Sequence, residues 1–170
     1  MIVPEIANQE RVVTSLAKLF PKANLVDRRQ QPSHGYRAIH VIVKLGDKPV
    51  EIQVRTALQH VWAELSEKIA DVVDPAIKYG GGPQAISNVL LEASITISQE
   101  ETQEIALASL ESQVSAKLSG ERLEKDKEEG LISLRRQIEE AQKSQISIRE
   151  NTVTSLRRVI EQIPVIGGEQ

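Results

Sequence analysis

The stretch YRAIHVIVKLGDKPVEIQVRT, residues 36–56, decides the fold of this chain. It contains two segments of alternating apolar and polar residues, Tyr36–Lys44 and Val50–Thr56, on either side of a turn-forming Gly46-Asp47 pair. Pairing them as a hairpin predicts six cross-strand pairs: Val43 with Val50, Val41 with Ile52, Ile39 with Val54, His40 with Gln53, Ala38 with Arg55, and Ile42 with Glu51. A slip of one residue would turn every side chain to the opposite face, so this register gives an apolar back and a polar front.

Helical patterns flank the hairpin. An apolar stripe predicts a helix over Gln9–Phe20, with Asn8 as its N-cap, and a second stripe predicts a helix over Ala57–Asp71. A short strand is expected at residues 23–29. We expect the helix Ala57–Asp71 to pack on the apolar back of the hairpin, with the first helix on the same side. The fold class predicted is α+β, a mixed sheet packed with helices.

The residue composition of the chain changes after residue 74. Residues 75–83 hold three glycines between two prolines, which predicts a loop without regular structure. We therefore expect a unit over residues 1–74, a linker over 75–83 and a helical tail over 84–170.

Three helices are expected in the tail. The first covers about Gln84–Ile97, and the second starts at the capping-box sequence Ser98–Glu101 and runs to about Leu118. The third spans roughly Leu131–Ile163. Its apolar residues near heptad spacing are Leu131, Leu134, Ile138, Ala141 and Ile148, with Gln145 interrupting the seam and Leu156 out of phase. Two interpretations stay open: an appendage packed on the core or on itself, and a short coiled coil for self-association or partner docking.

The composition limits the class of protein. The net charge of −3 does not favour generic binding to nucleic acid, and the absence of cysteine excludes disulfides and thiolate metal sites. The amino terminus lacks the pattern of a signal peptide, and no apolar run approaches the roughly 20 residues of a membrane helix. We expect a soluble, cytoplasmic protein that does not bind membranes.

The polar front of the hairpin gathers residues suited to a nucleotide. At 3.3 Å per residue they spread over about 13 Å along the strands. An aromatic ring can stack on a base, amide and guanidinium groups can bond base edges or phosphate, and a carboxylate can bind Mg²⁺ or take a proton. The residues are Tyr36, His40, Glu51, Gln53 and Arg55. The alternative is an ordinary solvated sheet face. Tyr36, an aromatic on the polar side of a chain with few aromatics, counts against this alternative, and the pattern alone proposes a site and no more.

Arg28 and Arg29 also have two interpretations. They form either the solvated end of a strand or a phosphate contact, and the pattern does not choose between them. His34 and His60 are expected at the surface, since scattered histidines lack the spacing of a metal site.

Three blocks of this sequence resemble a known family. His34–His40, Glu51–Thr56 and Gln59–Glu64 are similar to motifs of the synthetase domain of the RelA/SpoT family, most of all to its small alarmone synthetases. The resemblance covers about residues 1–75. It implies a nucleotidyltransferase-like fold and a GTP diphosphokinase, which transfers pyrophosphate from ATP to the 3′-hydroxyl of GTP or GDP in the stringent response.

The resemblance also implies roles for the residues of the polar front. Tyr36 would stack on the acceptor guanine, and Glu51 would be the catalytic residue that helps hold Mg²⁺ and activates the 3′-hydroxyl. The acceptor pocket would be lined by His40, Gln53 and Arg55. The family's carboxyl-terminal helices imply that the tail forms a homo-oligomer.

One departure from the family pattern concerns the start of the chain. The family's first Mg²⁺-binding aspartate lies on an upstream strand in an Asp-x-x-Gly-x-Arg context, whose tail end Met1-Ile2-Val3 resembles. We therefore expect the chain to lack the ATP-binding half and one metal ligand, and to catalyse little by itself. Two alternatives stay open: a catalytically dead nucleotide sensor or coiled-coil interaction protein, and a toxin-like relative that modifies other nucleotides or an RNA 3′ end.

Overall fold

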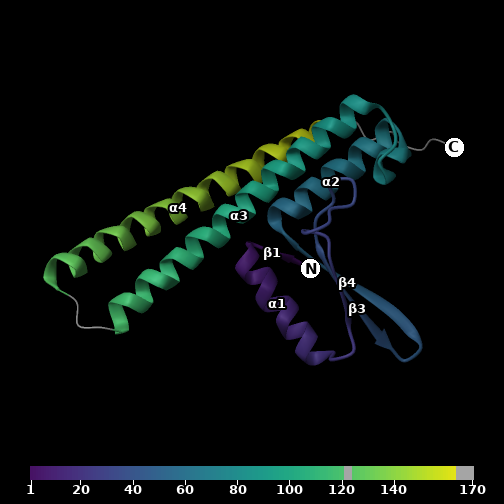
Figure 1. Cartoon of the computed structure of the whole chain (residues 1–170). Helices are drawn as coiled ribbons and strands as arrows, with labels where there is room; N and C mark the ends of the chain where they lie inside the picture. The colour runs from purple at the N-terminus through teal and green to yellow at the C-terminus, as the bar shows by residue number, and fades with distance from the viewer. Residues whose placement is uncertain (121–123, 164–170) are drawn as a thin grey trace.

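The computed structural model describes residues 1–120 and 124–163. A small sheet with one covering helix forms one lobe, and a long pair of helices projects beyond it (Figure 1). The elements along the chain are β1 (Ile2–Val3), α1 (Ile6–Leu19), β2 (Asn24–Asp27), β3 (Ile39–Leu45), β4 (Lys48–Thr56), α2 (Ala57–Val72), the 3₁₀ helix η1 (Pro75–Tyr79), α3 (Gln84–Gly120) and α4 (Lys125–Gln162). The predicted α+β class is confirmed.

The central hairpin has the predicted register. Strands β3 and β4 are antiparallel, and Ile39 lies opposite Val54, His40 opposite Gln53 and Ile42 opposite Glu51. Gly46 takes a φ of 62° in the turn, a conformation that glycine adopts without steric cost. The alternation of the sequence was therefore sufficient to predict which side chains share a face.

The sheet has four strands in the order β1-β4-β3-β2. Strand β2 extends the hairpin as an antiparallel neighbour of β3, within the predicted range 23–29. On the other edge, β1 runs parallel to β4 and places Ile2 beside Arg55 and Val3 beside Thr56. The carboxyl ends of β1 and β4 thus meet where α2 begins.

Helix α1 covers the apolar back of the sheet. Val13 packs there with Val41 and Val54, and the partly buried side chains of Leu16 and Phe20 pack against this cluster. The helix begins three residues before the predicted Gln9, because Glu5 and not Asn8 stands at its N-cap. Glu104 of α3 accepts a hydrogen bond from the Ile6 amide at 2.8 Å, a tertiary cap that local sequence does not reveal.

The prediction that the helix Ala57–Asp71 packs on the apolar back is wrong. Helix α2 has the predicted bounds to within one residue, but its stripe faces the tail. Trp62 and Leu65 lie in a second core with Leu90 and Ile97 of α3 and with Val153 of α4. Since α1 already covers the sheet, the apolar stripe of α2 is buried by helices that come later in the chain.

Two predictions for the segment after α2 are wrong as well. Residues 75–79 form η1, whose first turn is capped by the Asp74 carboxylate at 2.8 Å from the Ala76 amide. Helix α3 runs without a break from Gln84 to Gly120, past the expected restart at Ser98. The Glu101 carboxylate bonds residues outside α3 and does not turn back to the Ser98 amide, so no capping box forms.

Helix α4 returns along α3 as an antiparallel partner (Figure 1). It begins at Lys125, six residues before the predicted Leu131, in a run of good helix formers without an apolar stripe. Ile138 and Val153 are buried, whereas Ile148 of the predicted seam is half exposed. Gln145, expected to interrupt the seam, lies on the inner side and donates to the Glu100 carbonyl at 3.0 Å. The parts of the predicted tail at 121–123 and 164–170 lie outside the described residues.

None of the helices within residues 1–120 and 124–163 combines the length and the apolar character that spanning a bilayer requires.

Candidate nucleotide site

Five predicted site residues form one hydrogen-bonded group on the polar front of the sheet. Strand β3 supplies His40 and β4 supplies the three alternate residues Glu51, Gln53 and Arg55, whose side chains share a face because strand side chains alternate. Tyr36 reaches the same face from the segment before β3. The hairpin register is therefore what brings these residues together.

The Tyr36 hydroxyl is the centre of the group. It lies 3.0 Å from His40 Nε2, accepts from Arg55 Nη2 at 3.0 Å and faces Gln53 Oε1 at 3.3 Å. The Arg55 guanidinium also stands over the Tyr36 ring, 5.1 Å from its centroid. Burial raises the pKa of the Tyr36 hydroxyl, and the nearby Arg55 opposes this rise. The ring is thus held at a fixed angle while part of it stays accessible.

His40 links the tyrosine to the carboxylate. Its Nδ1 lies 2.7 Å from Glu51 Oε1, and Gln53 Nε2 donates to the same oxygen at 3.1 Å. A carboxylate only accepts, so the neutral imidazole carries its proton on Nδ1 and accepts the Tyr36 proton on Nε2. Burial, with the positive charges of Arg28 and Arg55, lowers the pKa of His40 below its ordinary 6.5, against the opposing effect of Glu51.

The two arginines at the end of β2 lie on different sides of the sheet. The Arg28 amide donates to the Ala38 carbonyl at 2.9 Å, and the Arg28 charge is near enough to His40 of the polar front to lower the pKa of that histidine. Arg29 is bound by Asp27 at 2.6 Å and by Glu10 of α1 at 2.7 Å. Hydrogen bonds from Arg29 keep the pKa of Asp27 below its ordinary value although burial of that carboxyl acts in the other direction. Arg29 therefore stabilises α1 against the sheet.

A cavity of about 160 Å³ opens beside Tyr36. Its walls come from the segment before β3, from α2 and from η1: Ser33, His34, Tyr36, Trp62, Ala63, Ser66, Glu67, Ile77 and Lys78. The combination of an aromatic ring with a carboxylate and hydroxyls suits a flat heterocycle that carries N–H donors.

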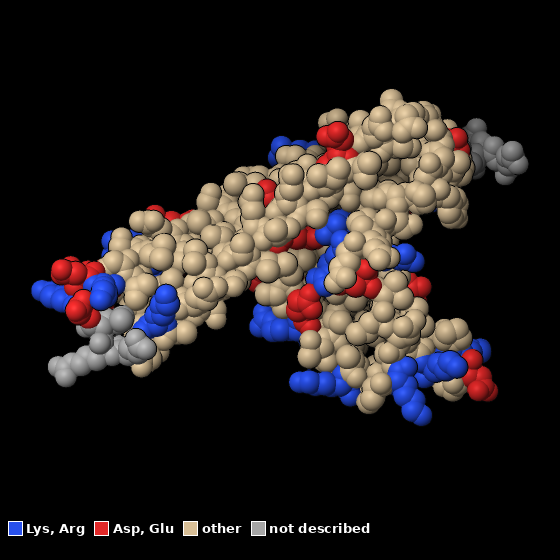
Figure 2. Space-filling model, viewed as in Figure 1, with Lys and Arg blue, Asp and Glu red and all other residues tan. Residues whose placement is uncertain are grey.

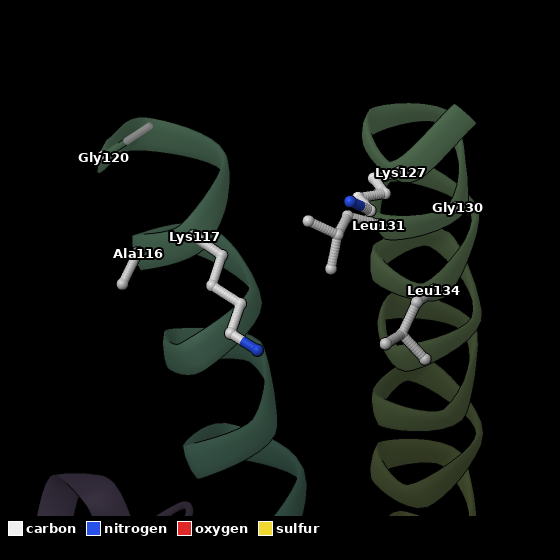
Figure 3. A pocket seen from close by; sticks show the side chains of 7 residues that line it. All are labelled: Ala116, Lys117, Gly120, Lys127, Gly130, Leu131 and Leu134. Atoms are coloured by element: carbon white, nitrogen blue, oxygen red, sulfur yellow. The ribbon is translucent and has the colours of Figure 1, made fainter. Parts of the chain in front are cut away.

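A larger cavity, of about 780 Å³, lies far from this group, between the last turns of α3 and the first turns of α4 (Figure 3). Its lining is Ala116, Lys117, Gly120, Lys127, Gly130, Leu131 and Leu134. Among the described residues that line it there is no carboxylate and no aromatic ring, so this lining differs in chemistry from the sheet front.

A buried polar network supports the site from behind. Gln9 of α1 donates to the Val54 carbonyl at 2.7 Å and to Gln59 at 2.8 Å, and Gln59 donates to Glu101 of α3 at 2.6 Å. Glu101 also holds Arg37 at 2.6 Å. Sequence reasoning missed these residues. The one available signal was the capping-box spacing of Thr56 and Gln59, which the structure forms.

Metal-ligand chemistry on the front rests on one carboxylate. In the described parts of the chain, no three or more acidic, histidine or cysteine side chains are grouped so that they could hold a metal ion. Mg²⁺ is commonly held by one or two carboxylates together with water and substrate phosphates. Glu51, with a side chain 43% exposed, fits one such ligand position.

Two comparisons with known proteins find sequences similar to this chain. Residues 2–70 match the family model for the region found in RelA / SpoT proteins, which spans the sheet, α1 and most of α2. The chain is also 28% identical, over 171 aligned positions, to the uncharacterized protein Rv1366 of Mycobacterium tuberculosis (strain H37Rv) and to the uncharacterized protein Mb1401 of Mycobacterium bovis. The alignments cover 96% of this chain and 58% of each relative.

Proposed function

We propose that this chain, whose residues 2–70 are a domain of the RelA/SpoT family, binds a guanine nucleotide on the polar front and transfers pyrophosphate from ATP to the 3′-hydroxyl of that nucleotide. The observation that carries the proposal is the group around the Tyr36 hydroxyl. It sets a ring, two hydrogen-bonding side chains, a guanidinium and a carboxylate on one face of the hairpin.

In this proposal the guanine base lies beside Tyr36. The ring forms one wall of the 160 Å³ cavity, and a stacked base would extend into it. The Watson–Crick edge of guanine presents two neighbouring donors, and Glu67 on the wall of that cavity is an acceptor for such donors.

In this proposal the phosphates of the nucleotide bind the positively charged side chains of the polar front. Arg55 is within 3.2 Å of the Tyr36 hydroxyl, and Arg28 is close enough to lower the pKa of His40. A guanidinium binds phosphate with paired donors, so these two side chains can hold the charged end of a nucleotide.

Glu51 is the base of the proposed reaction. The acceptor 3′-oxygen attacks the β-phosphorus of ATP, the bond from that phosphorus to the α-phosphate oxygen breaks, and AMP leaves. The proton of the 3′-hydroxyl passes to Glu51, which His40 and Gln53 orient through its Oε1 atom. A Mg²⁺ ion held by Glu51 and the phosphates would neutralise part of the negative charge of the phosphates.

A transfer assay tests the proposal. The chain is incubated with labelled ATP, Mg²⁺ and GDP or GTP beside Glu51→Gln, with Glu64→Gln on the outer side of α2 as the matched control. Because the chain is expected to lack the ATP-binding half, we expect only a small amount of labelled guanosine product with the wild-type chain and with the control, and none with Glu51→Gln. If neither product nor GDP binding is detected, the proposal fails.

A second candidate function is a guanine-nucleotide sensor without catalysis. It is favoured by the single carboxylate of the front and by the length of the tail, which binds the residues on either side of Tyr36. In the same experiment, saturable GDP binding without product at high protein concentration would select this candidate.

We also propose that the tail associates with a second copy of this chain. The face of the α3–α4 pair that is seen in Figure 2 shows few charged side chains along its length, and on this face a group of them lies at the end where α3 ends and α4 begins. Val89, Leu91 and Ile95 on α3 are all about half exposed or more. Analytical ultracentrifugation of the chain and of Leu91→Gln/Ile95→Gln tests this. A concentration-dependent dimer that the double variant loses is expected, and a monomer at every concentration would contradict it.

A further inference from the structure

Helix α3 is bonded to the residues directly before and after Tyr36. The Ser94 hydroxyl donates to the Gly35 carbonyl at 2.6 Å. On the other side of Tyr36, Arg37 donates to Glu101 through Nη2 at 2.6 Å and Nε at 3.2 Å. Ser94 is 3% exposed and Glu101 5%, so both contacts are shielded from water.

The contacts come from one face of α3. Leu90, Ser94 and Glu101 are spaced by four and seven residues, which places them on one side of a helix. The Leu90 carbonyl accepts from Trp62 Nε1 at 2.8 Å, which fixes the indole beside Gly35. A Cβ on Gly35 would lie 2.8 Å from the Trp62 ring, so the segment is held closely between α2 and α3.

The Tyr36 segment has little support of its own. Strand β3 begins only at Ile39, and the Tyr36 amide is bonded to the Ser33 carbonyl in a local turn. Gly35 has a φ of +90°, outside the conformations that strands and helices use. The backbone ladder of the sheet therefore does not reach Tyr36, whose contacts with the front come from its side chain alone.

We infer that α3 is a positioning element of the nucleotide site, in which Ser94 and Glu101 hold Gly35 and Arg37 and thereby place Tyr36. Neither residue touches the polar front, so both act through the segment that they bind. The effect on nucleotide affinity rests on the proposed function, whereas the restraint of the segment does not. A movement of α3 would alter both contacts together and displace the ring.

The test compares Ser94→Ala with Ser98→Ala, the same substitution one turn further along α3. The Ser98 side chain makes no hydrogen bond to any residue that the structure describes, so it is a matched control. Amide hydrogen exchange is followed by NMR in the free chain, GDP affinity by titration, and global stability by thermal unfolding. Arg37→Lys, which keeps the charge but loses the paired donors, is the second variant.

We expect faster exchange confined to residues 34–38 in Ser94→Ala and in Arg37→Lys, by about tenfold for a lost buried hydrogen bond. GDP affinity should fall by about three- to tenfold in both variants while Ser98→Ala behaves as wild type. Unchanged exchange at residues 34–38 would overturn the restraint. Faster exchange with unchanged GDP affinity would overturn the positioning role. If the wild-type chain binds no GDP, the proposed function fails, and the exchange in the free chain still decides whether α3 holds the segment.

Discussion

His40 Nδ1 lies 2.7 Å from Glu51 Oε1, so the imidazole and the carboxylate share one proton-bearing contact in the centre of the polar front. The carboxylate raises the pKa of His40, but burial and the neighbouring arginines lower it by more. The balance among these effects leads to the first prediction.

Removing the carboxylate should lower the pKa of His40 further. In Glu51→Gln the one charge that stabilises the imidazolium is lost, so the pKa falls below its wild-type value. Arg28→Gln should have the opposite effect, because a repelling cation is removed. Titration of the His40 ring signals by NMR measures both shifts, and a rise of the pKa in Glu51→Gln would contradict the assigned contact.

The same pKa determines a pH dependence of stability. Since the folded-state pKa of His40 lies below 6.5, the unfolded chain takes up the proton first. The contribution of neutral His40 is fully present above about pH 6.5 and is lost as the pH falls through the folded value. In urea unfolding between pH 8 and pH 5, the wild type should therefore lose stability at the acidic end while His40→Gln changes less with pH, so the difference between the two should narrow as the pH falls.

Tyr36 should matter to nucleotide binding mainly through its ring. Tyr36→Ala should weaken GDP binding by about ten- to a hundredfold, from the loss of base stacking. Tyr36→Phe keeps the ring and should lose less, although Arg55 and His40 lose a partner. Tyr79→Ala is the matched control, because Tyr79 is 80% exposed on η1. Calorimetric titration with GDP checks the series, and equal losses for Tyr36→Ala and Tyr79→Ala would refute the stacking role.

The buried ion pair of Arg37 and Glu101 should show strong coupling. Glu101→Gln leaves the Arg37 charge buried without its counterion and should cost about 3 kcal/mol or more of unfolding free energy. The double variant Arg37→Met/Glu101→Gln removes both charges and should recover much of that loss. Urea unfolding of the two single variants and the double variant gives the coupling energy. Additive single effects would show that the pair does not act as a unit.

Gly35 and Gly46 both have positive φ but differ in their surroundings. A Cβ at Gly35 would meet Trp62 at 2.8 Å, whereas nothing lies within 4 Å of the same atom at Gly46. Gly46→Ala should therefore cost only the backbone strain, about 1 kcal/mol. Gly35→Ala should cost clearly more and change the fluorescence of Trp62, the one tryptophan in the chain. Equal melting temperatures for the two variants would be inconsistent with the close packing at Gly35.

The hairpin and its polar front could be predicted because their pattern is local. Alternation along β3 and β4, with a glycine turn between them, leaves one register that buries Val41 and Val54 together. The shared face of His40, Glu51 and Arg55 then follows from the two-residue period of a strand.

The support behind the front could not be predicted in the same way. The partner of Arg37 is Glu101, which lies 64 residues further along the chain, and no local pattern links the two. The capping-box sequence at Ser98–Glu101 was misleading for the same reason: the Glu101 carboxylate has a stronger tertiary partner than the local amide. The prediction of where α2 packs was wrong because its apolar stripe does not specify which of several apolar surfaces will bury it.

The long-range bonds of Glu101 also bear on the order of events during synthesis. While the chain grows on the ribosome, Arg37 and Gln59 emerge well before the carboxylate that neutralises and bonds them. The cap on α1 from Glu104 and the ion pair of that carboxylate with Arg149 come later still. The amino-terminal sheet therefore cannot complete its native contacts as a nascent domain. Its full set of long-range contacts can form only after α4 has been translated.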